Sequence, residues 1–320
     1  MMKCTELNLY TYDAPFKVPI KTNLVQMRKR QVLVVGVVID DVEYFAEVNS
    51  FETPWYHYET IATSIENCKV IFNNLKHINI TSIESLQPYL KADAPNASSA
   101  FDVIAYQYFN PLKRVTVPIG ETLHQGNNSF SHDAKRIKLK MHHHIVEQVQ
   151  TIRESSNIPL VIDANGLLRE DHFELLNTLS QYDISYIEQP FKHIKLYDAL
   201  LKRHPHIPLA IDESATDYAA IQLFRDIGVT TAVVKYSRIG GITRVQSLPK
   251  QMTYVSGGMY EFGLSKYMTA MLGEQFGTVP DVTKRGTYFE HDFTTYHEVV
   301  SDGCLTMTPP IVQKEQLTQL

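Results

Sequence analysis

The chain has 320 residues, 44% of them hydrophobic and 20% charged, so it can bury a large core and is not intrinsically disordered. Its net charge of −5 argues against the broadly basic surface of a nucleic acid-binding protein, and no apolar run is long enough to cross a bilayer. Cys4, Cys68 and Cys304 are scattered and odd in number, which indicates a reducing compartment rather than a disulfide framework or a zinc cluster. We therefore expect a cytoplasmic globular protein that binds neither nucleic acid nor membrane, and its oligomeric state is left open.

The first hundred or so residues predict an α+β region. Three strands are expected, the last two as an antiparallel pair that turns at Asp40-Asp41: Cys4–Tyr12, Val32–Ile39 and Glu43–Val48. Three helical patterns follow, at about Tyr56–Phe72, Ile83–Leu90 and Ser98–Phe109. Asn110-Pro111 should end the last helix, because proline disfavours helical backbone in the residue before it. Val18–Met27 is expected to be a loop that could close over an anionic substrate, next to a surface turn at Arg28-Lys29-Arg30.

From about Thr116 the pattern changes to short apolar runs separated by amphipathic helical stretches. Six runs are expected to be strands: Arg136–Met141, Ile158–Asn165, Ile184–Pro190, Ile207–Ser214, Thr231–Ser237 and Met252–Ser256. Apolar strands that alternate with helices indicate βαβ units and a parallel sheet.

The charged residues near the ends of these runs recur at steps of 23 to 25 residues: Lys140, Asp163, Glu188, Asp212 and Lys235. Such a step fits one strand, one helix and two short loops, and repeated units of this kind can close into a (β/α) barrel, whose active sites lie at the carboxyl ends of the strands. A doubly wound open sheet is the structural alternative, but the glycine-rich phosphate turn typical of that fold, GxGxxG, does not occur here.

Three carboxylates end consecutive predicted strands, so Asp163, Glu188 and Asp212 should be neighbours at the barrel mouth. Converging carboxylates repel one another unless a cation lies between them, and hard oxygen ligands suit Mg²⁺, with Mn²⁺ as a possible substitute. An aspartate after a strand is, taken singly, more often a turn residue or a helix cap. Five charges in register at five strand ends are not explained in that way.

Lys138 and Lys140 lie two apart on one strand, so both point to the same face. A second ammonium and a metal lower the pKa of an amine, which allows it to act as a base. Lys235 should lie across the mouth from this strand, with the metal between. Base, metal and opposing cation together predict abstraction of a proton next to a carboxylate.

Two weaker groups of residues remain open. Ser256, Gly257 and Gly258 end the next strand, and they either allow a ligand to approach the backbone or form a tight turn. Asn165, Gln189 and Glu213 adjoin the proposed metal ligands and could orient them or simply cap helices.

At these residues the chain resembles the enolase superfamily, in its muconate-lactonizing-enzyme-like subgroup, and most of all the o-succinylbenzoate synthases. The matching motifs in chain order are Lys138–Lys140 (KLK), Asp163–Asn165 (DAN), Glu188–Pro190 (EQP), Asp212–Ser214 (DES), Val233–Gly241 (VVKYSRIGG) and Gly257–Gly263 (GGMYEFG). The resemblance implies an α/β fold with a modified (β/α)7β barrel of the TIM type and an α+β capping domain. It divides the chain into a cap at 1–114, a barrel at 115–290 and a C-terminal segment, 291–320, that returns to the cap.

The resemblance also implies a lyase of menaquinone biosynthesis that acts on a small carboxylate in a magnesium-dependent syn-dehydration. Asp163, Glu188 and Asp212 would bind Mg²⁺, Lys140 would remove the α-proton, and Lys138 would assist electrostatically. Lys235 would stabilise the enediolate from the opposite face.

Three other functions stay open on the sequence. Racemisation of N-acylamino acids or epimerisation of dipeptides could use Lys140 and Lys235 as opposed bases. A Schiff-base enzyme could use either lysine, but it has no need of three acids. A non-catalytic scaffold has no reason to keep five converging charges.

Overall fold

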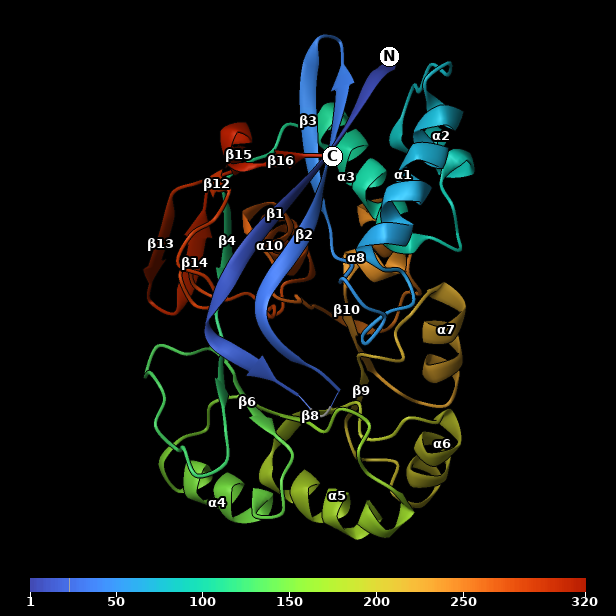
Figure 1. The fold of residues 1–320 in the computed structure, drawn as a ribbon. Helices are drawn as coiled ribbons and strands as arrows, with labels where there is room; N and C mark the ends of the chain where they lie inside the picture. The colour runs from blue at the N-terminus through green and yellow to red at the C-terminus, as the bar shows by residue number, and fades with distance from the viewer. Residues whose placement is uncertain (23) are drawn as a thin grey trace.

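An antiparallel sheet of four strands and the helices packed on it form the N-terminal part of the computed structural model, which describes residues 1–22 and 24–320 (Figure 1). The strands, in the spatial order β16-β1-β2-β3, are β16 (Thr318–Gln319), β1 (Cys4–Lys21), β2 (Gln26–Ile39) and β3 (Val42–Val48). The helices are α1 (Ile61–Leu75), α2 (Ile83–Leu86), which continues into a 3₁₀ turn at Gln87–Tyr89, and α3 (Pro95–Phe109). The predicted pair across Asp40-Asp41 is confirmed as β2 and β3.

The segment predicted as a loop at Val18–Met27 mostly extends the β1–β2 hairpin, in which Ile20 pairs with Met27; Asn23 lies outside the described residues. The expected surface turn at Arg28–Arg30 was wrong, because these residues continue β2 and Arg30 is buried. The first strand extends past its predicted end at Tyr12 to Lys21. Pro15 is tolerated within it because β16 pairs with β1 only at Tyr10 and Thr11, so no ladder bond to β16 needs the N–H that proline lacks.

Two helices begin at residues other than the predicted ones, each for a local reason. Helix α1 begins at Ile61 rather than Tyr56, because Thr60 and Thr63 form a reciprocal capping box. Helix α3 begins three residues before the predicted Ser98, with Pro95 in its first turn, where the missing N–H of proline costs nothing. It ends at Phe109, as Asn110-Pro111 predicted.

Seven parallel strands form the second sheet, in the order β11-β10-β9-β8-β7-β6-β5. They are β5 (Glu121–Leu123), β6 (Ile137–Lys140), β7 (Leu160–Asp163), β8 (Ile184–Glu188), β9 (Leu209–Ile211), β10 (Thr231–Val234) and β11 (Thr253–Ser256). Each of the six predicted runs contains one of them. The helices between and after them are α4 (Ile145–Ser155), α5 (Phe173–Leu179), α6 (Ile194–Arg203), α7 (Tyr218–Asp226), α8 (Tyr236–Ile239), α9 (Ile242–Gln246) and α10 (Gly263–Phe276), with 3₁₀ turns at Glu170–His172 and Ser180–Tyr182. The predicted fold class, a curled parallel sheet of the barrel type with a capping region, is confirmed.

An irregular segment takes the place of the eighth barrel strand after α10. Asp281 N donates to Ser256 O at 2.8 Å, and Arg136 Nη1 donates to Val279 O at 2.7 Å. Pro280 has no N–H to give to a strand ladder. The segment therefore bridges the gap between β11 and the β5–β6 side of the sheet without being a strand.

The C-terminal segment contacts both parts of the molecule. Strands β13 (Glu298–Ser301) and β14 (Cys304–Met307) form an antiparallel sheet with β4 (Val115–Pro118), which therefore lies outside the barrel sheet. A smaller ladder joins β12 (Thr294–Thr295) to β15 (Ile311–Val312), and a 3₁₀ turn at Lys314–Gln316 leads to β16 on the capping sheet. The division of the chain at residues 114 and 290 stays a prediction. Among the described residues, no helix combines the length and the apolar character needed to span a membrane.

Candidate active site

A small apolar layer inside the barrel fixes the direction of the site residues. It is separate from the main core and takes one residue from each of five neighbouring strands: Val161, Tyr186, Ala210, Val233 and Val255. Side chains alternate along a strand, so the residues two positions further on share their direction at the carboxyl ends. These residues are Asp163, Glu188, Asp212, Lys235 and Gly257. In register, Lys138 lies beside Val161 and Lys140 beside Asp163, so the structure brings all six predicted charges to one mouth.

Each of the three acids is paired with a lysine. Lys140 Nζ lies 2.5 Å from Asp163 Oδ2, and Lys138 Nζ lies 2.9 Å from Glu188 Oε2. Lys235 donates to both oxygens of Asp212, at 2.6 Å to Oδ2. These pairs neutralise most of the charge at the mouth.

The three lysines differ in their surroundings. The Lys140 side chain is 41% exposed, whereas those of Lys138 and Lys235 are 8% and 6% exposed. Burial disfavours the charge of Lys235, but attraction to Asp212 outweighs it and raises its pKa. Lys138 behaves in the same way, because Asp281 and Glu188 outweigh its burial and raise its pKa. Lys138 and Lys235 are thus fixed cations, and Lys140 is the accessible amine.

The acids suit a hard divalent cation in chemistry and in position. All three donors are carboxylates on the consecutive strands β7 and β8 and just after β9, and the buried Oε2 of Glu188 lacks a well-directed hydrogen bond. Burial and the charges of Asp163 and Asp212 raise the pKa of Glu188, which means that the site is short of positive charge around this carboxylate. As the side chains stand, no three acidic, histidine or cysteine groups in the described part of the chain converge on one point, since each acid is turned to a lysine.

The polar residues beside the acids contact them directly. Gln189 accepts hydrogen bonds from Asp212 N at 2.9 Å and Ser214 N at 3.1 Å, so it fixes the backbone that carries Asp212. Asn165 accepts from Lys140 Nζ at 3.1 Å and donates to Glu213 Oε1 at 3.1 Å. These contacts suit an orienting function, which stays a prediction.

The three residues at the end of β11 have different environments. Ser256 is buried, and its hydroxyl has no partner in the described structure. A Cβ on Gly257 would lie 2.9 Å from Val233 Cγ1 and 3.5 Å from Lys235 Nζ, so only glycine leaves Lys235 its space. A Cβ on Gly258 would lie 2.9 Å from the carbonyl oxygen of Asp281. Close packing thus accounts for both glycines, and a contact with substrate stays a prediction.

Sequence reasoning missed three residues that contact the site. Arg238 donates to Asp212 Oδ1 at 2.9 Å, and also to Tyr56 Oη at 2.8 Å. Tyr56 belongs to the loop before α1, and its ring centre lies 5.9 Å from Lys235 Nζ, so the capping region reaches the mouth. Asp281 binds Lys138 from the irregular segment after α10. The recurring strand ends do not indicate any of these residues, because all three lie outside strands.

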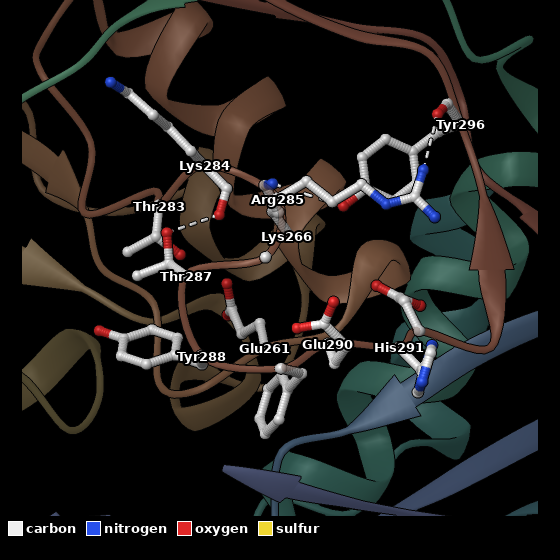
Figure 2. Close-up of a pocket in the computed structure, with 13 residues that line it drawn as sticks. Glu261, Lys266, Thr283, Lys284, Arg285, Thr287, Tyr288, Glu290, His291 and Tyr296 are labelled. Carbon is white, nitrogen blue, oxygen red and sulfur yellow. Dashed lines mark hydrogen bonds between the residues drawn. The ribbon is translucent and has the colours of Figure 1, made fainter. Parts of the chain in front are cut away.

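Aromatic side chains join the β1–β2 hairpin to the segments that follow β11 and α10. Phe16 pairs with Phe289 across an isolated bridge, and the centre of its ring lies 5.4 Å from that of Tyr260. Figure 2 shows the pocket that lies between residues 283–292, Glu261 and Lys266, with a volume of about 30 Å³. This volume suits water rather than a substrate, and none of the predicted catalytic or metal-binding residues lines it.

The barrel region is similar to known proteins. Residues 124–253 match the family model described as enolase C-terminal domain-like. The o-succinylbenzoate synthase of Bacillus subtilis is 25% identical over 96% of this chain and 92% of its own. The N-succinylamino acid racemase of Thermus thermophilus is 25% identical over 95% of this chain and 92% of its own.

Solved structures share the fold. An enolase superfamily member from Listeria innocua superposes with a TM-score of 0.85 at 20% identity, over 99% of this chain and 95% of its own. A dipeptide epimerase from Cytophaga hutchinsonii, solved with Mg and D-Ala-L-Val, has a TM-score of 0.77 at 21% identity, over 100% of this chain and 99% of its own. The match over residues 124–253 and the similarity to o-succinylbenzoate synthases confirm the resemblance drawn from the motifs, and the solved structures confirm the fold.

Proposed function

We propose that this chain, whose residues 124–253 match the enolase C-terminal domain-like model, is an o-succinylbenzoate synthase. This enzyme converts 2-succinyl-6-hydroxy-2,4-cyclohexadiene-1-carboxylate to 2-succinylbenzoate by loss of water, a step of menaquinone biosynthesis. Similarity to o-succinylbenzoate synthases at 23–25% identity, extending in two of them over 96% of the chain, supports the proposal.

The chemistry follows from the three lysines. Lys140 in its neutral form takes the proton from the ring carbon that carries the carboxylate, and the electron pair moves toward that carboxylate. Lys235 faces the growing negative charge from the other side, and Lys138 adds a fixed positive charge. The ring hydroxyl then leaves with the proton that Lys140 returns, so water departs and the ring becomes aromatic.

Asp163, Glu188 and Asp212 would hold a magnesium ion. When bound, the ion supplies positive charge that stabilises the substrate carboxylate as the charge on it increases. Lys140 and Lys235, which now pair with Asp163 and Asp212, would then face the substrate instead.

The observation that favours dehydration is the asymmetry of the lysines. A syn-dehydration needs one base, and Lys140 is the accessible amine with a single acidic partner. Lys235 is buried, with a side chain only 6% exposed. A buried ammonium suits electrostatic stabilisation better than proton removal.

The alternative is racemisation of N-succinylamino acids or epimerisation of dipeptides. It is favoured by a different observation: Lys140 and Lys235 lie at the ends of β6 and β10, with three strands between them. Two amines on opposite sides of one substrate carbon are what a 1,1-proton transfer requires.

Two assays on one enzyme preparation separate these functions. Dehydration of the cyclohexadiene carboxylate is followed by loss of diene absorbance, and exchange at the α-carbon of N-succinyl-L-amino acids in D₂O is followed by NMR. The synthase proposal expects a kcat/KM for dehydration at least as high as that for exchange. Exchange with no dehydration would move the function to racemisation, and a Lys235→Met variant that retains exchange in only one enantiomer would identify the second base.

A further inference from the structure

Asp281 lies where the barrel sheet is open, on the irregular segment between α10 and the C-terminal strands. Its N–H donates to Ser256 O at 2.8 Å, which ties it to the end of β11. Its side chain reaches across to residues at the start of β6. Asp281 thus connects β11, at one edge of the sheet, to β6, which lies next to the other edge, beside the cluster of charges.

The carboxylate of Asp281 is divided between two cations. Oδ1 accepts a short hydrogen bond from Arg136 Nη2, and Oδ2 accepts from Lys138 Nζ at 2.8 Å. Arg136 is itself immobilised, because its Nη1 donates to Val279 O at 2.7 Å and to Tyr186 Oη at 3.2 Å. The position of the Asp281 carboxylate is therefore fixed from both sides.

Lys138 is in turn held between two carboxylates. Its ammonium contacts Asp281 on one side and Glu188 on the other, at 2.8 and 2.9 Å. Lys140 is two residues further on the same strand and has no second acidic partner in the described structure. This difference in partners explains how two lysines in one motif can have different functions.

We infer that Asp281 is a positioning residue that fixes Lys138 beside Glu188 as a stationary cation. The inference deepens the proposed function and rests on it, since Lys138 is assumed to act on the charge that develops in the substrate. Without the Asp281 carboxylate, Lys138 keeps Glu188 as its single acidic partner and loses its fixed position. Loss of a partner that orients a site residue typically costs about 10- to 100-fold in activity.

A double-mutant cycle tests whether Asp281 acts through Lys138. Asp281→Asn keeps the shape and removes the charge, Lys138→Met removes the ammonium, and the third variant carries both changes. We expect Asp281→Asn to lower kcat by about 10- to 100-fold with little change in KM. In the Lys138→Met background, the same change should cost less than about threefold. An equal loss in both backgrounds, or no loss of kcat, would overturn the inference.

A substrate-independent measurement keeps this test apart from the proposed function. Lysines are acetylated with isotope-coded acetic anhydride in the native protein, and the labelling of Lys138 and Lys140 is measured by peptide mass spectrometry. Asp281→Asn should increase the labelling of Lys138 severalfold while that of Lys140 stays the same. Unchanged labelling of Lys138 contradicts the inference even if the enzyme dehydrates its substrate, and increased labelling supports it even if no dehydration is seen.

Matched controls cover folding and unspecific effects. Asp226→Asn removes another aspartate that pairs with an arginine, Arg225 Nη2 at 3.0 Å, at the end of α7 that lies opposite the mouth. It should change neither kcat nor the labelling of Lys138. Should Asp281→Asn fail to fold, Asp281→Glu keeps the charge, and a partial kcat with protected Lys138 is then expected; a fully labelled Lys138 in that variant would count against the inference.

Discussion

Lys235 donates to both carboxylate oxygens of Asp212, and Arg238 donates to the same carboxylate from one helical turn further along the chain. All three side chains are nearly buried, so two cations share one anion. The two cations outweigh the burial of Asp212 and lower its pKa to about 2, and the carboxylate therefore stays ionised and ready to bind a cation across the whole useful pH range.

The first prediction concerns Asp212→Asn. We expect magnesium affinity and activity to fall together, each by at least about tenfold, because the amide lacks the charge that binds the ion. Isothermal titration with Mg²⁺ alone measures the affinity. Asp217→Asn, at the N-cap of α7, serves as the control and should bind Mg²⁺ like the wild type. Unchanged Mg²⁺ affinity in Asp212→Asn would remove it from the ligand set.

A second prediction assigns the base. Lys140→Ala should lose turnover by about 10³-fold or more, because Lys140 is the exposed member of the three lysines that pair with the site acids in the described structure. Magnesium affinity should stay within about a factor of ten of the wild type, since the base is not a ligand. Lys195→Ala, on α6, is a matched control that should keep full activity. Comparable turnover in Lys140→Ala would refute the assignment.

A third prediction concerns the docking of the cap. Glu47 on β3 is buried and accepts from Phe262 N at 3.1 Å and Ser265 N at 2.7 Å, so a carboxylate of the capping sheet satisfies the first turn of α10. Glu47→Ala leaves two buried N–H groups without partners and should lower the free energy of unfolding by about 3 kcal/mol. Urea unfolding, followed by the fluorescence of the single tryptophan Trp55, measures this change in the free energy of unfolding. The exposed Glu52→Ala should shift stability by less than about 0.5 kcal/mol; equal effects would disprove this role of Glu47.

A fourth prediction is a pH dependence at the loop before α1. His57 Nδ1 accepts from Glu59 N at 3.2 Å and Asn96 Nδ2 at 3.1 Å, so the ring is neutral. Burial and the charge of Arg238 lower its pKa to about 4. Between about pH 6.5 and 4 the unfolded chain binds more protons than the folded one, so stability falls as the pH falls.

The variant His57→Gln isolates the contribution of His57 to the pH dependence of stability. Between pH 7 and 5 the wild type should lose about 2 kcal/mol more stability than His57→Gln, which cannot titrate. Thermal or urea unfolding at both values gives the difference. Parallel pH curves for the two proteins, or an NMR titration of His57 near 6.5, would contradict the prediction.

The sequence predicted the barrel and its charged mouth because both follow from local rules. Strand ends that recur every two dozen residues place their side chains in one layer whatever the details of packing, and Asp163 and Glu188 lie where that rule puts them. The cap was less predictable. Pro15 is typical of a strand end, and the sequence does not show that the ladder with β16 stops before it. Tyr56 continues a helical pattern, and the cap at Thr60 starts the helix after it.

Contacts between distant segments could not be predicted from the sequence. Asp281 follows a proline in a segment without periodicity, so nothing local indicates that it meets Lys138, 143 residues earlier. Arg238 lies within a matching motif, yet its bond to Tyr56 depends on how the cap docks on the barrel. Positions that depend on tertiary closure are thus the ones that were missed.

The most direct test of the account is a spectrophotometric assay of the purified protein with 2-succinyl-6-hydroxy-2,4-cyclohexadiene-1-carboxylate, first with Mg²⁺ and then with EDTA. We predict rapid loss of diene absorbance with Mg²⁺, its disappearance with EDTA and its return when Mg²⁺ is added again. Turnover that survives EDTA would contradict the metal-assisted chemistry. No turnover with Mg²⁺ present would contradict the synthase function.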